Sequence, residues 1–349
     1  MSAYRVVQWA TGNIGSRSLR GVIEHPDLTL AGLYVYAADK VGRDAGELSG
    51  LGDRTGVLAT DDVEEIVALG ADCVLYMPQE CNFDDVCRLL ESGSNIVTTR
   101  GEFQYPPGMD QSIRARVESA CQRGGTSIHG TGSSPGFISE AVPLVLTSIQ
   151  RRLDSLSIEE YADLSQRNSP VLLFDLMGFG KDPAQFGRGR WAHGVESFGP
   201  SLRLVADAVG LPLDAVEASG EVATARRTTE IAAGTIEAGT VAAQRLRVQG
   251  LREGYPLINF VATWYCTTEL NADWDLRATG WRLFVAGDAP LDVEMRLAVP
   301  LEDMGEWSPG YTANRVVNAV AVVCAAAPGI RTTVELPQII GRLRQGGDR

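Results

Sequence analysis

Over roughly the first 137 residues, short apolar runs alternate with longer segments in which apolar residues recur every three or four positions. The runs predict buried strands, and the segments with helical spacing predict amphipathic helices. We expect strands over 4–10, 28–36, 71–78, 94–100 and 126–132. Because helices separate these strands, the pattern predicts a parallel, doubly wound α/β sheet.

From about residue 138 the pattern changes to longer strands in which apolar and polar residues alternate. These strands are expected over 153–165, 228–251, 256–266 and 280–299. Alternation of this kind, interrupted by Gly and Asp-Ala-Pro turns, predicts a mixed or antiparallel sheet with one open face. A final apolar helix is expected over 310–330, where it runs into a proline stop.

The composition excludes several classes of function. The 349 residues are 44% hydrophobic and 21% charged, which is ordinary for a globular protein with two domains. A net charge of -13 disfavours nucleic-acid binding. Six cysteines without a CxxC pair and three histidines leave little for a metal site, so no metal is expected. Reduced thiols are typical of a cytoplasmic protein, and no apolar run is long enough to predict a membrane partner.

A glycine-rich loop lies between the first expected strand and the first expected helix. It reads ATGNIG and is a GxGxxG pattern with alanine in the first position. Gly12 lets the backbone approach a pyrophosphate at the helix N-terminus, and Gly15 lets helix and strand pack closely. The alanine suits this turn if its φ is negative. In this context the pattern predicts a dinucleotide site rather than an ordinary tight turn. The residues expected to line it are Ala10, Thr11, Gly12, Asn13, Ile14 and Gly15.

The second expected strand ends without the acid that binds the ribose 2'-hydroxyl of NAD. Tyr34 and Tyr36 occupy that neighbourhood, and Lys40 and Arg43 follow. Cations without the acid favour the 2'-phosphate of NADP, with NAD as the alternative cofactor. The competing interpretation is that both cations are solvated loop charges.

Residues 41–52, VGRDAGELSGLG, resemble the GSDAGELAG stretch of dihydrodipicolinate reductases. The likeness continues through VTTRGEF at 97–103 and YTANRVVNAV at 311–320. However, the His-rich stretch of those reductases has no counterpart here. A second branch, containing 2,4-diaminopentanoate dehydrogenases and native amine dehydrogenases, is more similar. It shares the GTGxxPGF loop, here residues 130–137, and a glutamate after the strand, here Glu102.

The resemblance implies a Rossmann domain and an inserted α/β domain that carries substrate and subunit contacts. We place the Rossmann domain at 1–137, the substrate-binding and dimerisation domain at 138–310, and a C-terminal segment that packs back on the first domain at 311–349. The long apolar strands of the second domain favour a homodimer through that sheet.

The same branch implies NAD(P)-dependent reductive amination of a small ketone or aldehyde with ammonia, and the reverse oxidative deamination. Ligands of doubly wound sheets bind at the carboxyl ends of the strands, where Glu102 lies. A carboxylate there could take a proton from ammonium, return one to the departing water and stabilise an iminium cation. We expect no cation beside it, which would suit a neutral ketone. The alternative for Glu102 is a surface loop acid.

Further contacts are expected on both sides of the reaction centre. The additional cofactor-binding candidates are Tyr36, Lys40, Met77, Pro78, Thr98, Thr99, Gly101 and Asn314. The substrate-binding candidates are Ser134, Pro135, Tyr161 and Asn168. Tyr161 could equally be a core tyrosine and Asn168 a turn residue, while Trp264 and Trp281 suit core or interface positions. Two other functions stay open: a C=O or C=N reductase that does not use free ammonia, and a non-catalytic dinucleotide-sensing protein.

Overall fold

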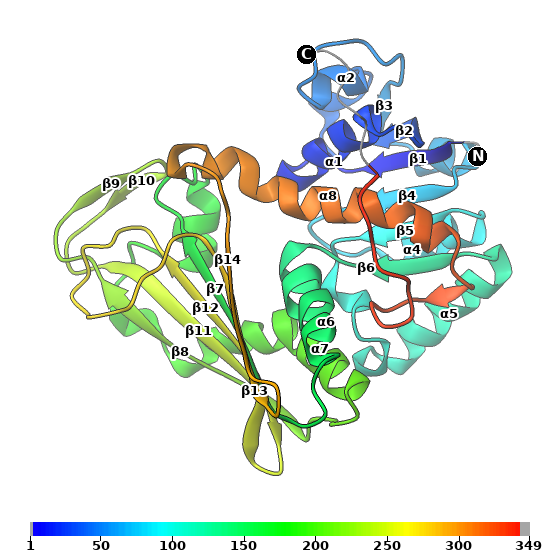
Figure 1. Ribbon diagram of the computed structural model, residues 1–349. Coiled ribbons are helices and arrows are strands. Elements are labelled where there is room, and N and C mark those ends of the chain that lie inside the picture. Colours follow the sequence, from blue (N-terminus) through cyan, green and yellow to red (C-terminus); the bar gives the residue numbers. More distant parts are fainter. Residues whose placement is uncertain (1–2, 343–349) are drawn as a thin grey trace. The chain divides into compact units, whose positions relative to one another are not determined.

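The computed structural model describes residues 3–342. The chain forms two compact units, one made of Met1–Phe137 with Pro309–Arg349 and the other of Ile138–Ser308 (Figure 1). All six cysteines are free thiols, and four of them are buried.

The first unit is built on a seven-stranded sheet whose neighbouring strands are all parallel, in the order β15-β6-β5-β4-β1-β2-β3. This arrangement confirms the predicted doubly wound sheet. The strands are β1 Tyr4–Trp9, β2 Leu28–Tyr34, β3 Ala59–Thr60, β4 Cys73–Tyr76, β5 Asn95–Thr98, β6 Ser127–Gly130 and β15 Gly329–Ile330.

Helices cover both faces of this sheet because its strands are apolar on both sides. They are α1 Asn13–Glu24, α2 Ala45–Leu48, α3 Val63–Ala68, α4 Phe83–Glu91, α5 Gln111–Gly124 and α8 Met304–Cys324. Helices α1 and α8 share one core with Val6 of β1. Helices α3, α4 and α5 form a second core, on the opposite face of the sheet, with Val7, which is the next residue of β1 (Figure 1). Alternate side chains of one strand therefore enter opposite cores.

The second unit contains a six-stranded sheet in the order β14-β13-β7-β12-β11-β8. Strands β7 and β12 are parallel and the other neighbours are antiparallel, so the predicted mixed sheet is confirmed. The strands are β7 Leu153–Asp163, β8 Ala215–Thr224, β11 Val241–Arg252, β12 Tyr255–Tyr265, β13 Gly280–Gly287 and β14 Leu291–Arg296. A separate hairpin pairs β9 Thr229–Ile231 with β10 Gly234–Ile236.

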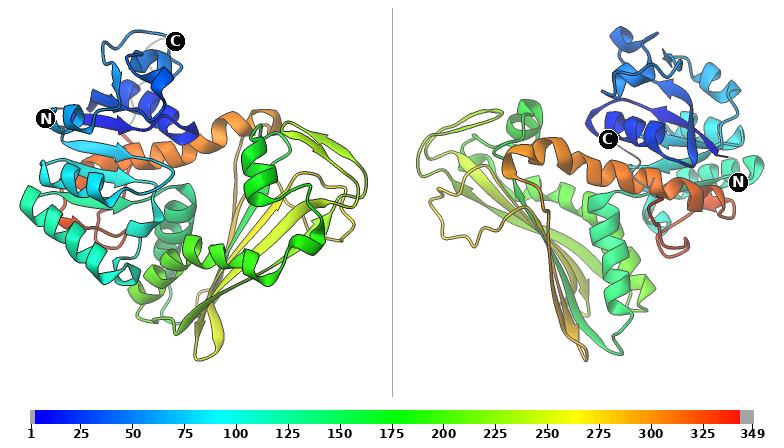
Figure 2. Two further views of the ribbon diagram at one scale, coloured as in Figure 1. Left: turned by 180° about the vertical axis from the view of Figure 1, so that it is seen from behind. Right: turned by 45° about the horizontal axis from the view of Figure 1, so that its top comes forward.

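The two faces of this sheet differ in character. Helix α7, Ala192–Ala208, packs against β8, β11 and β12, and α6, Val142–Thr147, packs against β13 (Figure 2). On this face, which we call the helix-packed face, Phe198 of α7 stacks on Phe260 of β12 with ring centroids 3.9 Å apart. The opposite face, which we call the polar face, presents charged side chains such as Glu159 and Arg282.

Candidate functional site

The glycine-rich loop joins β1 to α1 in the way that an anion site requires. Gly12 is the N-cap of α1 and supplies no side-chain hydrogen bond, and the first turn of the helix contains no acid. The first amides and the positive end of the helix dipole therefore stay available to an anion. A Cβ added to Gly12 would meet no heavy atom within 4 Å, whereas one on Gly15 would lie 2.2 Å from the carbonyl oxygen of Ala10. The loop thus fits a dinucleotide pyrophosphate.

Ala10 adopts a φ of +75°, so the condition under which alanine would suit this turn, a negative φ, is not met. An L-residue in the left-handed region costs roughly 1–2 kcal/mol. The surroundings hold it there: the Ala10 amide donates to the Tyr34 carbonyl at 2.9 Å, and the Gln8 amide nitrogen donates to the Ala10 carbonyl at 2.9 Å. Gln8 is fully buried and was not among the candidate residues.

Only one of the two expected cations reaches the loop. Lys40 donates from Nζ to the backbone carbonyl of Thr11 at 3.1 Å and to its hydroxyl at 3.0 Å. Arg43 instead forms an ion pair with Glu47 at 2.7 Å, one helical turn further along. The structure therefore places the positive charge of Lys40, but not that of Arg43, beside the glycine-rich loop.

Tyr36 lies near the same end of the sheet. Its side chain is 57% exposed, and its hydroxyl accepts a hydrogen bond of 2.9 Å from the indole of Trp9. Trp9 stacks on Tyr34 with ring centroids 3.8 Å apart. An exposed aromatic ring is thus anchored next to the loop, where a ribose or base could contact it.

The neighbouring strands β4 and β5 end at the same edge. Met77 and Pro78 follow β4, and the Met77 sulfur accepts a weak hydrogen bond of 3.8 Å from Gln8. Thr98, the last residue of β5, donates from its hydroxyl to the Tyr76 carbonyl at 2.6 Å. Thr98 is fully buried, so its hydroxyl fixes the strand end. Thr99 and Gly101 follow it in partly exposed positions.

Glu102 lies in a short 3-10 turn, Gly101–Phe103, just past the end of β5. Its carboxylate binds Arg100 through both oxygens, with Nη2–Oε1 at 2.5 Å and Nε–Oε2 at 3.2 Å. Arg100 also donates to the Gln79 carbonyl. The expectation that no cation accompanies Glu102 is therefore wrong. Burial, and then the nearby charge of Glu102, raise the pKa of the Cys81 thiol to about 12.

The loop after β6 lies against the end of β5. The Thr131 amide donates to the Thr98 carbonyl at 2.8 Å, and Ser133 donates from its amide to the hydroxyl of Thr312 on α8 at 3.2 Å. Ser134, next along, precedes Pro135 through a cis peptide bond. Three buried polar atoms of this region have no hydrogen-bond partner: Gln104 Oε1, Thr131 Oγ1 and Ser134 Oγ. Buried polar groups are almost always satisfied, so these atoms suit a polar ligand.

Sequence reasoning placed Ser134 in this region but missed Gln104 and Thr131. Their signal is position alone, because Thr131 directly follows β6 and Gln104 directly follows the short turn that contains Glu102. Asn314 lies two residues beyond Thr312 on α8, and its side chain is exposed.

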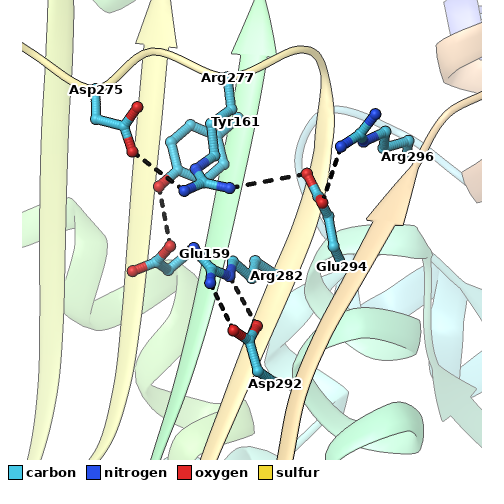
Figure 3. A network of polar contacts seen from close by, with 8 residues as sticks. All are labelled: Glu159, Tyr161, Asp275, Arg277, Arg282, Asp292, Glu294 and Arg296. Atoms are coloured by element: carbon cyan, nitrogen blue, oxygen red, sulfur yellow. Dashed lines mark hydrogen bonds and ion pairs between the residues drawn. The ribbon is translucent and has the colours of Figure 1, made fainter.

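Tyr161 and Asn168 belong to the second unit. Tyr161 lies on the polar face, and its hydroxyl donates to the carboxylate of Glu159 at 2.9 Å. The centroid of its ring lies 5.9 Å from the guanidinium carbon of Arg277. Burial, and then the bond to Glu159, raise its pKa to about 12. Figure 3 shows the ion pairs around it, including the two-pronged contact of Arg282 with Asp292. Asn168 is exposed in the loop that follows β7.

In residues 3–342, no three His, Cys, Asp or Glu side chains gather as metal ligands would. None of the helices in this described part of the chain combines the length and the apolar character needed to cross a membrane.

Comparisons with known proteins agree with the geometry. A family model described as "2,4-diaminopentanoate dehydrogenase C-terminal domain" matches residues 137–345. An amine dehydrogenase of Streptomyces virginiae is 30% identical over 97% of this chain and 98% of its own length. A 2,4-diaminopentanoate dehydrogenase of Acetoanaerobium sticklandii is 25% identical over 47% of this chain and 48% of its own. The solved amine dehydrogenase of Mycobacterium smegmatis has a TM-score of 0.77 at 21% identity, covers 98% of both chains, and confirms the fold.

Proposed function

The chain belongs to the amine dehydrogenase and 2,4-diaminopentanoate dehydrogenase family, and from this premise we propose that it reductively aminates a small ketone or aldehyde with ammonia and catalyses the reverse oxidative deamination. It is an NAD(P)-dependent oxidoreductase. The nicotinamide dinucleotide, when bound, supplies the hydride in one direction and accepts it in the other.

The observation that carries the proposal is the position of Glu102. It follows β5 at the same carboxyl edge of the parallel sheet at which the glycine-rich loop follows β1. Ligands of such sheets bind at this edge, close to the point where the strand order reverses. A partly buried carboxylate there is placed to exchange protons with a reacting group.

The overall reaction needs one group that both accepts and donates protons. A ketone, ammonium, hydride and one proton give a protonated amine and water. Glu102 takes a proton from ammonium before nitrogen attacks the carbonyl carbon, and it returns a proton when the carbon–oxygen bond of the carbinolamine breaks. Its negative charge also stabilises the iminium cation.

Arg100 positions the carboxylate for this work. Oε1 is held at 2.5 Å from Nη2, whereas Oε2 lies 3.2 Å from Nε, which is a longer and weaker contact. We therefore assign the exchanged proton to Oε2. Because Arg100 is itself fixed by the Gln79 carbonyl, the arginine restrains Glu102 without supplying a proton.

The cofactor residues support a preference for NADP. Lys40 is held against Thr11 of the loop and would neutralise a 2'-phosphate, and no acid occupies the end of β2. Substrate contacts by Ser134, Pro135, Tyr161 and Asn168, and a homodimer through the six-stranded sheet, belong to the same proposal.

The test is the oxidation of NADPH and NADH with a panel of ketones and aldehydes, each with and without ammonium. The proposal expects oxidation only when a carbonyl compound and ammonium are both present. Oxidation that is independent of ammonium would identify a C=O reductase instead. Tight cofactor binding without any turnover across the panel would identify a binding protein.

A further inference from the structure

Gln104 carries a carboxamide that is buried without a partner. The residue directly follows the 3-10 turn that contains Glu102, and its backbone amide donates to the Gly101 carbonyl at 3.1 Å. The side chain is almost fully buried, at 2% exposure. Among the residues that the structure describes, its Oε1 accepts no hydrogen bond and its Nε2 donates none. Such a group is costly, because folding has removed its hydrogen bonds to water without replacing them.

The carboxamide lies beside the ends of two neighbouring strands. A Cβ added to Gly130, the last residue of β6, would lie 3.4 Å from Cγ of Gln104. A Cβ added to Gly101, in the turn after β5, would lie 3.7 Å from its Oε1. Both neighbours are glycines, so neither position contributes a side chain that covers the carboxamide. The unpaired group is therefore held at the same carboxyl edge of the sheet as the glycine-rich loop.

The order of the strands identifies which half of a dinucleotide belongs at this position. A dinucleotide crosses a doubly wound sheet where the strand order reverses, which is here between β1 and β4 (Figure 1). The adenosine half extends towards β2, where the 2'-hydroxyl or 2'-phosphate is bound, so the nicotinamide half is expected over β4, β5 and β6. Gln104 lies on that side of the glycine-rich loop, whereas Tyr36 and Lys40, which follow β2, lie on the other.

The chemistry of the nicotinamide matches that of the glutamine side chain. Both carry a primary amide, which offers one carbonyl acceptor and two N–H donors. Two such amides can form a closed pair in which each N–H donates to the carbonyl of the other, and this pair satisfies both groups of the glutamine at once. The terminal torsion of glutamine is broad and roughly two-fold, so its oxygen and nitrogen can exchange places to suit the partner. The competing partner is a buried water molecule.

We propose that Gln104 is a specificity-determining residue for the cofactor and binds the carboxamide of the nicotinamide through an amide–amide pair. The pair restricts rotation of the nicotinamide ring and so determines which face of the ring is presented for hydride transfer. The proposal requires only that the chain binds a nicotinamide dinucleotide, and it does not depend on the proposed amination.

The direct test is calorimetric binding of three ligands: NADP+, its 3-acetylpyridine analogue and 2'-phospho-ADP-ribose. The analogue has a methyl group in place of the amide nitrogen, and 2'-phospho-ADP-ribose lacks the nicotinamide ring. If NAD+ binds more tightly than NADP+, the corresponding NAD series replaces these ligands. Gln104→Met removes the carboxamide at similar volume. Because two hydrogen bonds are lost, we expect it to raise the Kd for NADP+ about tenfold and that for 2'-phospho-ADP-ribose less than about twofold.

The analogue tests the same contact without a substitution. Wild type should bind it about tenfold more weakly than NADP+, because its methyl group cannot donate to Gln104, and Gln104→Met should bind both alike. If Gln104→Met does not fold, wild type alone decides, and equal affinities for NADP+ and the analogue would overturn the proposal. The matched control is Gln111→Met, at an exposed glutamine that begins α5, which should bind all three ligands as wild type does.

A structural role for Gln104 predicts a different result. Gln104→Met should melt no lower than wild type in the absence of ligand, because an apolar side chain replaces an unpaired buried amide. A lower melting temperature together with weaker binding of all three ligands would identify a structural, water-bound glutamine and overturn the proposal. An unchanged Kd for NADP+, or a preference for NADP+ over its analogue that persists in Gln104→Met, would overturn it as well.

Kinetics separate this contact from the proposed function. Where ammonium-dependent turnover is found, Gln104→Met should raise the KM for NADPH about tenfold and leave the KM for ammonium close to wild type. If turnover is found and the KM for NADPH does not change, the contact fails and the proposed function stands. If no carbonyl compound is turned over, the proposed function fails and the binding affinities still decide the role of Gln104.

Discussion

Replacing Glu102 by glutamine tests the proposed acid/base role. The substitution removes proton exchange at this position, and its effect on the reaction rate can be compared with its effect on the stability of the fold. Glutamine keeps the size of the side chain but cannot exchange the proton, and loss of a general base costs about 10²–10⁴ in rate, or about 2.7–5.5 kcal/mol of barrier. The structural loss is the ion pair with Arg100, whose side chains are 27% and 33% exposed. Partly exposed pairs contribute about 0–1 kcal/mol, so instability cannot account for a hundredfold loss of rate.

The assay for Glu102→Gln is ammonium-dependent oxidation of NADPH at saturating cofactor. We expect kcat/KM to fall at least about a hundredfold. Cofactor affinity by fluorescence and the melting temperature should stay close to wild type. The matched control is Glu80→Gln, an exposed acid in the neighbouring loop after β4, which should retain full activity. A kcat/KM within about fivefold of wild type, with the variant folded, would refute the mechanism.

Four further substitutions test other parts of the structure. Gly15→Ala should destabilise the fold by about 1–3 kcal/mol in urea unfolding, because its Cβ would lie 2.2 Å from the Ala10 carbonyl oxygen. Gly12→Ala should lower the free energy of unfolding by less than about 1 kcal/mol yet weaken dinucleotide binding severely. Equal effects of the two substitutions would contradict the assignment of the glycine-rich loop as the pyrophosphate site. Lys40→Met should raise the Kd for NADPH about tenfold and leave that for NADH nearly unchanged, and a parallel shift in both would argue against a 2'-phosphate contact. Burial lowers the pKa of His129 from 6.5 to about 4, so the unfolded chain binds a proton that the folded chain excludes. Stability should fall by up to roughly 3 kcal/mol as the pH drops from about 6.5 to about 4, and His129→Gln should flatten that dependence.

The elements of the first unit could be predicted because their signals are local. Helix α5 illustrates this: Asp110 caps its N-terminus by accepting from the Ser112 and Ile113 amides, and Gly125 ends it with a φ of +67°. The spacing of apolar residues and the capping residues at both ends of a helix can be recognised within a short stretch of sequence. The alternation of strands and helices then leaves few topologies.

The conformation of Ala10 could not be predicted in the same way. Its positive φ depends on Gly15, five positions later, and on Tyr34 of the adjacent strand. No property of alanine itself favours the left-handed region. The pairing of Arg100 with Glu102 was likewise hidden, because the strand ends at Thr98 and the two side chains are directed by an irregular segment and a 3-10 turn that have no repeating pattern in the sequence.

Glu159 and Glu160 of β7 illustrate which features of the sequence are informative in the second unit. They are the same residue type at adjacent positions, yet strand geometry sends them to opposite faces. Glu159 lies on the polar face with Tyr161 and pairs across the strands with Arg282, a position where an acid is expected. Glu160 occupies an alternate position that should be apolar, and there its carboxylate accepts from the indole nitrogens of Trp264 and Trp281. A break in the alternation of a strand is therefore more informative than the acid itself, because a carboxylate on an apolar face is costly unless hydrogen bonds satisfy it.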